Sequence, residues 1–420
     1  MITRARTFLD RLGPGLITGA ADDDPSGIAT YSQAGAQFGL GMLWSVFLTT
    51  PLMVGIQIVS ARIGRVSGHG IARNLRDHYP RPLMWFIVSL LLVANTINIA
   101  ADIGAMAQAL QLVIDGPVHV YSIGFGLLAV VMQVFLPYQR LAPLLKWLTL
   151  ALFAYVGVVM TVDIPWRQLF VATIVPPVEL TRDYLLVLVG VLGTTISPYL
   201  FFWQASQEVE EQRMAQGEEP LRFSPTNARD HLRRIKLDTW VGMLFSNAIA
   251  FFIMLTAAVT LHTAGITNID TSAQAAEALR PIAGNFAFVL FAAGIIGTGL
   301  LAVPVLAGSA AYAVAEANEW PIGHGLQPTD AKGFYSIITL ATLLGVALGF
   351  TPIDPIKALF WSAVLNGVIA VPIMVVMMRM AVREDIMGPF VITRRLRRLG
   401  WMATGAMTLA VAAMLGSMSL

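Results

Sequence analysis

Three consecutive aspartates, Asp22, Asp23 and Asp24, lie inside an apolar segment that runs from about residue 12 to residue 40. The run Pro25-Ser26-Gly27 follows them directly. A charged residue at the centre of a membrane helix costs roughly 2.5–3.5 kcal/mol on insertion scales, so three facing lipid would cost on the order of 8–10 kcal/mol. Carboxylates at this depth are therefore expected to face a cavity or a bound cation. The segment predicts a cation pathway.

The same segment is expected to be a broken helix. Proline removes a backbone donor and glycine tolerates non-helical angles, so the run after Asp24 frees backbone groups near the middle of the bilayer. Such groups are tolerated only where they line a cavity. A second candidate break is Gly193-Thr194-Thr195-Ile196-Ser197-Pro198-Tyr199. Interrupted segments at matching places in two halves point to the site of an inverted-repeat transporter. Alternatively, Pro198 only kinks its helix, and the hydroxyls bond back to that helix.

The two breaks together offer a set of ligands made only of oxygen. Carboxylate, carbonyl and hydroxyl oxygens suit hard cations such as Mg²⁺, Mn²⁺ and Ca²⁺, whereas softer metals prefer thiolate, thioether or imidazole. The chain has no cysteine, and neither break contains methionine or histidine. Mg²⁺ also keeps several of its waters, so a wide cavity with few direct ligands fits it. The predicted metal positions are Asp24, Gly27, Thr194, Thr195 and Ser197.

The remaining acids are expected to act around this ion. Asp22 and Asp23 lie about 200° and 100° around a helix from Asp24, so all three cannot point at one ion on a regular helix. We expect them to supply negative potential. Asn95, Asn98 and Asp102 share one helical face at i, i+3 and i+7. This polar stripe is a candidate water-filled route or proton relay, or else hydrogen-bonding glue between helices. The predicted pathway residues are Asp22, Asp23, Asn98, Asp102 and Tyr199.

Composition places the chain in a membrane. Of its 420 residues, 56% are hydrophobic and 12% are charged, and the mean hydropathy is +0.70. Soluble domains carry about 25% charged residues. Apolar windows of about 20 residues predict an all-α protein with about eleven spans, at about 12–40, 42–63, 84–111, 118–137, 144–162, 184–206, 239–263, 284–316, 333–350, 355–378 and 400–418. The eighth window is long enough to be two pieces or one tilted helix.

These spans are expected to form one transmembrane domain over residues 1–420. Repeat one would cover about 12–162, repeat two about 184–378, and an extra C-terminal helix about 400–418. With the N-terminus in the cytoplasm, 23 of the 27 Lys and Arg residues lie on the inner side. That asymmetry predicts a multi-pass protein of the cell's inner (plasma) membrane. The polar stretch 207–238 is expected to be a partly helical cytoplasmic loop.

The predicted partners are a divalent metal ion and membrane lipid, with no nucleic acid, and the chain is expected to be a monomer. The basic cluster Arg394–Arg398 is expected to anchor the inner end, with some attraction to anionic lipid.

At this point the chain resembles the NRAMP divalent-metal transporter family over nearly its whole length. Gly13-Pro14-Gly15 leading into Asp24-Pro25-Ser26-Gly27 and Gln33-Ala34-Gly35-Ala36 is similar to the family's first helix, and Gln57 to Gly68 is similar to the end of its second. Asp102 falls on the acid of the third helix, and Gly193-Thr194 to Pro198 on the break of the sixth. The resemblance implies five-plus-five inverted repeats, a fold like that of sodium-coupled amino-acid transporters, and alternating access.

The chain also departs from that family's site. Ser26 replaces a glycine, and Gly27 replaces a metal-ligating asparagine. In the sixth helix Thr194 takes the position of a carbonyl donor, Ser197 that of a methionine ligand and Tyr199 that of a histidine. The glutamate of the third helix is replaced by Ala105. These changes resemble the NRAMP-related magnesium transporters, a branch thought to carry hydrated Mg²⁺ and Mn²⁺ without proton coupling.

The sequence therefore favours a carrier for divalent cations, Mg²⁺ and Mn²⁺, working by alternating access without proton coupling and without a cofactor. The alternative is a proton-coupled Mn²⁺ or Fe²⁺ transporter that uses Asp102 as its relay. A carrier of organic solutes on the same scaffold is a third possibility, although the acids argue against an anionic substrate. A membrane-embedded hydrolase using Asp24 with Asp22 or Asp23, or a structural or signalling protein, is disfavoured. We expect no enzymatic activity.

Overall fold

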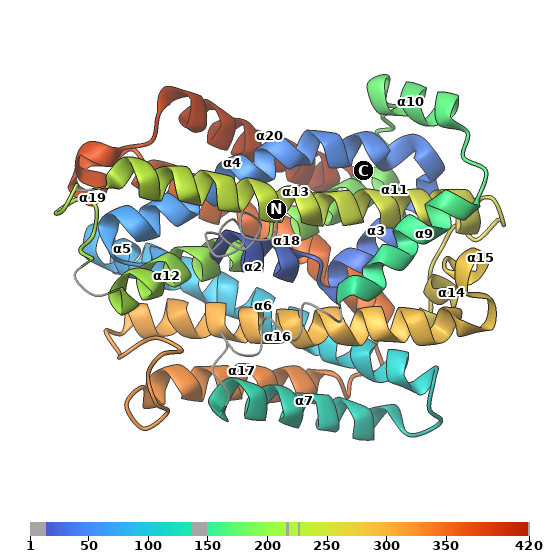
Figure 1. Ribbon diagram of the computed structural model, residues 1–420, viewed down its shortest axis with the longest axis horizontal. Helices are drawn as coiled ribbons and strands as arrows, with labels where there is room; N and C mark the ends of the chain where they lie inside the picture. Colours follow the sequence, from blue (N-terminus) through green and yellow to red (C-terminus); the bar gives the residue numbers. More distant parts are fainter. Residues whose placement is uncertain (1–13, 136–148, 216–217, 226, 419–420) are drawn as a thin grey trace, which may run out of the picture.

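The computed structural model describes residues 14–135, 149–215, 218–225 and 227–418, and this part of the chain contains helices and no strand. The long helices lie alongside one another, roughly along the horizontal axis of Figure 1. Eight helices of the described part are long and apolar enough to cross a membrane, or nine if one bent pair counts as a span. The all-α class predicted from the sequence is confirmed.

Both predicted breaks are present. The first span consists of α2 (Pro14–Asp22) and α3 (Pro25–Phe38), and the sixth consists of α11 (Arg182–Thr195) and α12 (Pro198–Met214). Each second half begins with a proline, whose missing N–H and fixed φ suit the first turn of a helix. The prolines therefore end one half-helix and start the next.

The other elements follow the predicted order. The first group after the broken span is α4 (Leu43–Ser67), α5 (Ile71–His78), α6 (Arg81–Gln111) and α7 (Val118–Phe135). Then come α9 (Phe153–Thr161), α10 (Trp166–Ile174), α13 (Ala228–Ala257), α14 (Ser272–Glu277) and α15 (Arg280–Ala283). The chain ends with α16 (Ala287–Ala317), α17 (Lys332–Leu348), α18 (Pro355–Met380), α19 (Glu384–Met387) and α20 (Arg394–Met418).

The helices differ from the predicted apolar windows in the eighth span and around the fifth. The eighth window is a single helix, α16, despite Pro304 in its interior. The fifth window falls partly on residues 136–148, which lie outside the described residues, and its last part, α9, is followed by the short helix α10. Residues 150–161 and 166–174 meet at a bend of 116° that apolar windows do not reveal.

The polar stretch 207–238 is partly helical, as expected, because α12 and α13 both extend beyond their apolar windows. Arg234 of α13 lies 2.8 Å from carboxylate oxygens of both Glu208 and Glu211 of α12. These ion pairs join the charged end of α12 to the charged start of α13.

Glycines allow the broken spans to pack closely on their neighbours. A Cβ at Gly19 of α2 would lie 2.3 Å from the backbone of Gly242 in α13, and one at Gly193 of α11 would lie 2.1 Å from the carbonyl oxygen of Ala363 in α18. Small residues permit such approach in membrane helix pairs. α2 and α11 are thereby held against α13 and α18.

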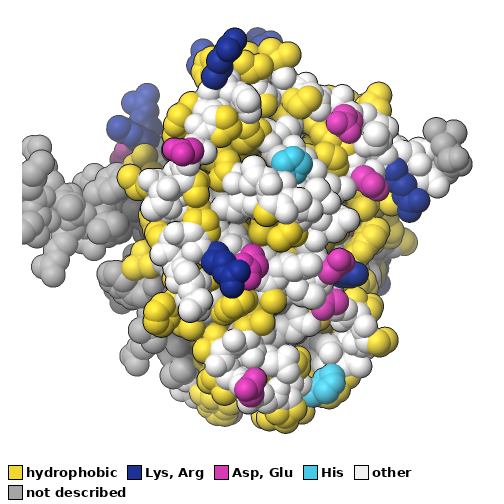
Figure 2. All heavy atoms as spheres, turned by 90° about the vertical axis from the view of Figure 1, so that its right-hand side faces the viewer, with side chains coloured by type: hydrophobic (Ala, Val, Ile, Leu, Met, Phe, Trp, Pro, Cys, Tyr) yellow, Lys and Arg dark blue, Asp and Glu magenta, His cyan; other side chains and the backbone are white. Residues whose placement is uncertain are grey.

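The two ends of the bundle carry different short helices. Figure 2 looks onto the end that carries α10, α14 and α15, which the sequence predicts to be the outer end. Charged side chains of both signs are scattered there rather than gathered into one large patch. The opposite end carries α5, α19 and the start of α20 (Figure 1).

Candidate metal site between the two broken helices

Asp24 is the N-cap of α3, and its two carboxylate oxygens have different surroundings. Oδ1 accepts hydrogen bonds from the Gly27 amide at 2.7 Å and from the Ser26 hydroxyl at 2.6 Å. Both donors sit in the first turn of α3, where free amides and the helix dipole favour a negative charge. Ser26 and Gly27, the two departures in the first break, thus orient Asp24.

The other oxygen, Asp24 Oδ2, points towards the second break. Its contact is the hydroxyl of Tyr199 in the first turn of α12, at 3.5 Å. Tyr199 donates a shorter bond, 3.0 Å, to the carbonyl oxygen of Ala21 at the end of α2. Because 3.5 Å is at the outer limit for a hydrogen bond, Oδ2 is the oxygen with capacity for a cation or its water.

The second break supplies hydroxyl and carbonyl oxygens at the end of α11. The Ser197 hydroxyl donates to the carbonyl oxygens of Gly193 at 2.9 Å and Thr194 at 2.8 Å. Thr194 Oγ1 is buried and has no hydrogen-bond partner within the described residues. The last carbonyls of a helix also carry a partial negative charge. This end of α11 therefore suits a cation.

The two breaks meet directly. A Cβ at Gly27 would lie 3.3 Å from Thr194 Oγ1, so the first turn of α3 faces that hydroxyl. The Tyr31 hydroxyl lies 3.0 Å from Thr195 Oγ1, and Thr195 also donates to the Val191 carbonyl at 2.6 Å. The Thr195 hydroxyl is thus engaged by both α3 and its own helix. Asp24, Thr194, Thr195 and Ser197 are only 1–2% exposed.

Asp22 and Asp23 face another helix. The hydroxyl of Ser246 in α13 lies 2.6 Å from Asp22 Oδ2 and 3.0 Å from Asp23 Oδ1. Asp22 Oδ1 has no hydrogen-bond partner within the described residues. As expected from the helical angles, the three aspartates do not converge: the described residues include no group of three or more acidic, His or Cys side chains that could hold a metal ion. Sequence reasoning missed Ser246, because a lone serine in an apolar helix carries no distinctive signal.

Asp102 lies on α6 and is fully buried, with both carboxyl oxygens lacking a hydrogen-bond partner within the described residues. Asn98, one turn away, donates to the side-chain oxygen of Asn366 in α18 at 3.1 Å. Asn95 donates to the Leu306 carbonyl of α16 at 2.8 Å. The two asparagines thus link helices, whereas Asp102 has capacity for water or a proton.

A methionine lies near the first break. A Cβ at Gly299 of α16 would lie 2.4 Å from the sulfur of Met106 in α6 and 3.4 Å from Cγ of Pro25. Met106 is 1% exposed and follows Asp102 by one turn. Local sequence patterns do not indicate this approach, because it arises from packing between α6, α16 and α3.

A cavity of about 260 Å³ lies on the side of the site that the sequence predicts to face outwards. It is lined from α3 by Ala29 and Gln33, from α11 by Val187, and from α18 by Lys357, which pairs with Asp270 at 2.9 Å. Ala29 is about 7 Å along the helix from Asp24 at 1.5 Å per residue. Towards the other end, α2 is packed on α13, and the Gly15 amide donates to Asp238 at 2.7 Å. The approach to the site from the side of this cavity is therefore the more open one.

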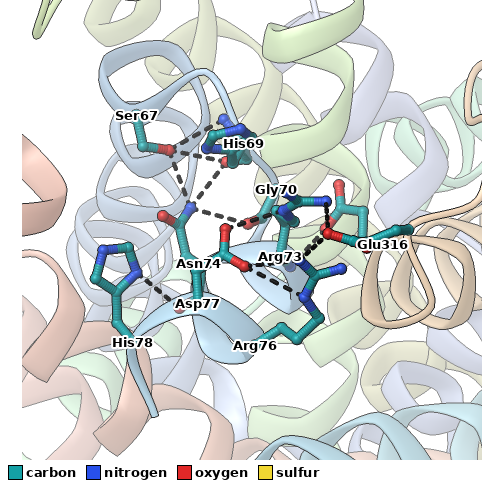
Figure 3. Close-up of polar contacts among 10 residues, drawn as sticks. Ser67, His69, Gly70, Arg73, Asn74, Arg76, Asp77, His78 and Glu316 are labelled. Carbon is teal, nitrogen blue, oxygen red and sulfur yellow. Dashed lines mark hydrogen bonds and ion pairs between the residues drawn. The ribbon is translucent and has the colours of Figure 1, made fainter.

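A second polar cluster lies at the end that the sequence predicts to be cytoplasmic (Figure 3). The carboxylate of Glu316, at the end of α16, accepts from the Arg73 amide in the first turn of α5 and from the Ser206 hydroxyl, each at 3.2 Å. Burial lowers the pKa of nearby His69 to about 4, with the charges of Arg222 and Arg73 adding to the effect. This cluster ties α5 to α16 and is built from contacts that hold helices together.

Comparison with solved structures places the fold among transporters. The Eremococcus coleocola manganese transporter, solved with an aromatic bis-isothiourea compound, is similar with a TM-score of 0.76 and 16% identity, over 97% of this chain and 87% of that one. A mutant of that transporter gives a TM-score of 0.74 at 16% identity, over 95% and 84%. Mhp1, a nucleobase-cation-symport-1 family transporter, gives 0.57 at 12% identity, over 97% and 92%.

These likenesses confirm the amino-acid-transporter-like fold with broken first and sixth helices. The family described as Nramp, natural resistance-associated macrophage protein-like, matches residues 15–417. The chain is a multi-pass membrane protein and belongs to the Nramp family.

Proposed function

We propose that this chain is a carrier for divalent cations, Mg²⁺ and Mn²⁺, that binds the ion between the two broken helices and works by alternating access. Membership of the Nramp family and the similarity to a manganese transporter support divalent metal transport. They also support a transporter rather than an enzyme. The observation that carries the assignment is Asp24 Oδ2, a buried carboxylate oxygen that faces the second break at the Tyr199 hydroxyl, the start of α12.

The donor set supports a hard, partly hydrated ion. Asp24 caps the first turn of α3, and Gly27 of that turn faces the Thr194 hydroxyl, beside which Ser197 donates to the Thr194 carbonyl. Few direct ligands leave room for water, which suits Mg²⁺ because it dehydrates reluctantly. No cofactor is part of this proposal, since the metal is the substrate.

The route and driving force follow from the same geometry. The cavity beside Lys357 and Asp270 is the proposed entrance, and opening the inner side requires α2 to leave α13. With the proposed cytoplasmic N-terminus in the plasma membrane, the membrane potential drives uptake: two charges crossing 100 mV gain roughly 4.6 kcal/mol. We take the chain as a monomer with one domain over residues 1–420, two repeats and an extra final helix.

A proton-coupled Mn²⁺ or Fe²⁺ carrier is the second candidate, and one observation favours it. Asp102 is buried and its carboxyl has no hydrogen-bond partner within the described residues, which leaves both oxygens free to accept a proton or a water. The resemblance to the family places a histidine and a glutamate at two further relay positions, where this chain has Tyr199 and Ala105. Neither tyrosine nor alanine exchanges a proton near neutral pH.

Reconstituted liposomes test both candidates. We expect entry of Mg²⁺ and of Mn²⁺, mutual inhibition between them, and no acidification reported by an internal pH dye. Asp24→Asn should reduce flux roughly 10-fold or more, because hydrogen bonds and contacts to a charged group are worth about 1.5–3 kcal/mol. Asp163→Asn is the matched control: it changes an exposed aspartate in a loop and should leave flux unchanged.

Two outcomes would overturn the lead proposal. Metal-dependent acidification that is lost in Asp102→Asn would establish the proton-coupled candidate instead. Equal flux in wild type and Asp24→Asn would show that the ion does not bind at the break in the first helix.

A further inference from the structure

Helix α20 has one face inside the bundle and one face without a protein neighbour among the described residues. Gly400, Ala403 and Met407 are buried on the side that packs against α4, α11 and α18. On the other side Met402 is 62% exposed and Leu409 is 73% exposed. An exposed apolar stripe on a membrane helix faces acyl chains.

The start of this exposed face is a basic groove. Arg394, Arg397, Arg398, Trp401 and Met402 line an open groove of about 600 Å³. Their positions, i, i+3, i+4, i+7 and i+8, place them on one side of the helix. Arg395, in the same turn, does not line the groove.

The three arginines of the groove are not neutralised by an acidic side chain of the described residues. Within the described residues none of them makes an ion pair, and the first turn of α20 contains no acidic residue. Like charges at i, i+3 and i+4 repel one another, and cations at a helix N-terminus oppose the helix dipole. An anion held in the groove would offset both costs.

The apolar residues beside the arginines indicate what kind of anion fits. Trp401 and Met402 are directly next to the basic groove, and the exposed stripe continues from Met402 to Leu409. A ligand that fills this surface has an anionic head and an apolar chain. Tryptophan is also typical of the level of lipid headgroups.

We propose that the groove of Arg394, Arg397, Arg398, Trp401 and Met402 is a binding site for one anionic phospholipid, with its phosphate on the arginines and its acyl chain along Met402 and Leu409. Arginine suits this role because its planar guanidinium binds phosphate oxygens in pairs. The site is separate from the broken helices, so it stands or falls independently of the transported ion.

The test uses the full chain in neutral detergent with lipid added in mixed micelles. Phosphatidylglycerol should raise the thermal unfolding midpoint, whereas phosphatidylcholine and inorganic phosphate should not. Replacing all three groove arginines, as Arg394→Gln, Arg397→Gln and Arg398→Gln, should weaken the apparent affinity on the order of 100-fold, since each arginine near an anionic surface is worth roughly fivefold. Arg395→Gln is the matched control and should behave as wild type.

Tryptophan fluorescence supplies a second readout that does not depend on unfolding. Brominated phosphatidylglycerol should quench part of the emission, and Trp401→Phe should lose that part while the protein elutes as wild type does. This measurement decides the matter if the triple variant folds poorly.

Several results would overturn the proposal. Equal stabilisation by phosphatidylcholine would show that no anionic head is needed, and stabilisation by inorganic phosphate alone would show that no acyl chain is needed. A lipid response that is unchanged in the triple variant, quenching unchanged in Trp401→Phe, or a stable dimer that covers this face of α20 would also exclude a lipid site here.

Discussion

Replacing Gly19 by alanine should bias the protein towards an inward-open state. In the structure a Cβ at this position would lie 2.3 Å from the carbonyl carbon and oxygen of Gly242. Ordinary contact begins at about 3.4 Å, so α2 and α13 must separate by roughly 1 Å where they cross. Backbone cannot move aside as a flexible side chain can, and added methyl groups in tight packing cost about 1–3 kcal/mol.

This cost falls on one conformation only. The state seen here, with α2 packed on α13, bears the clash, whereas a state in which α2 has moved away from α13 does not. The equilibrium should therefore shift by about 1–3 kcal/mol, or roughly 5–150-fold, towards the open inner side.

Cysteine labelling measures this shift cleanly, because the chain has no cysteine of its own. Ser246 is fully buried between α2 and α13, so Ser246→Cys reports on their separation. A small maleimide should label Ser246→Cys several-fold faster when Gly19→Ala is added. Gly405→Ala in α20, where a Cβ meets nothing within 4 Å, is the control. Equal or slower labelling in a correctly folded Gly19→Ala protein would refute the reasoning.

Three further predictions concern side chains outside the proposed ligand set. Met106→Leu should leave the ratio of Mn²⁺ to Mg²⁺ flux unchanged, because the sulfur packs against Gly299 and does not bind the ion. Transport competition between the two ions measures this ratio, and a marked fall in it would show that the sulfur does bind the ion. Glu316→Ala should destabilise the protein by roughly 1.5–3 kcal/mol, because buried donors of α5 lose a charged acceptor, and thermal unfolding compared with exposed Glu384→Ala measures this. His69 has a pKa of about 4, below its ordinary value of about 6.5, so the folded state binds fewer protons between these values. Its contribution to stability is therefore complete above about pH 6.5 and is lost as the pH falls towards 4, and His69→Gln should show a smaller loss of thermal stability between pH 7.5 and 4.5 than wild type does.

The sequence was sufficient for the fold because the membrane imposes strong rules. Most apolar windows coincide with long helices of the described part, since a bilayer leaves few alternatives to helices, and Pro25 and Pro198 located the two breaks. Helix ends were less predictable. Ion pairs such as Arg234 with Glu208 extend α12 and α13 past the apolar windows, and hydropathy does not register such pairs.

The candidate site was predictable in its residues but not in its contacts. Asp24 and Thr194 could be chosen because each adjoins a break, and in the structure Asp24 faces Tyr199 of the second break while Thr194 faces Gly27 of the first. That Asp24 keeps one oxygen for Ser26 and Gly27 follows from the capping geometry of α3. The contact of Ser246 with the neighbouring aspartates depends on a helix more than 200 residues away, which local spacing cannot indicate.

The most direct test of the central claim is to locate a bound ion. Crystals grown with Mn²⁺ should give an anomalous difference peak between Asp24 Oδ2 and the end of α11 at Thr194. The peak should lie about 2 Å from the carboxylate oxygen for direct coordination, or about 4 Å for contact through one water, and Mg²⁺ in excess should remove it. A peak beside Asp102 and Met106 instead, or one that persists unchanged in Asp24→Asn, would contradict a site built from the two helix breaks.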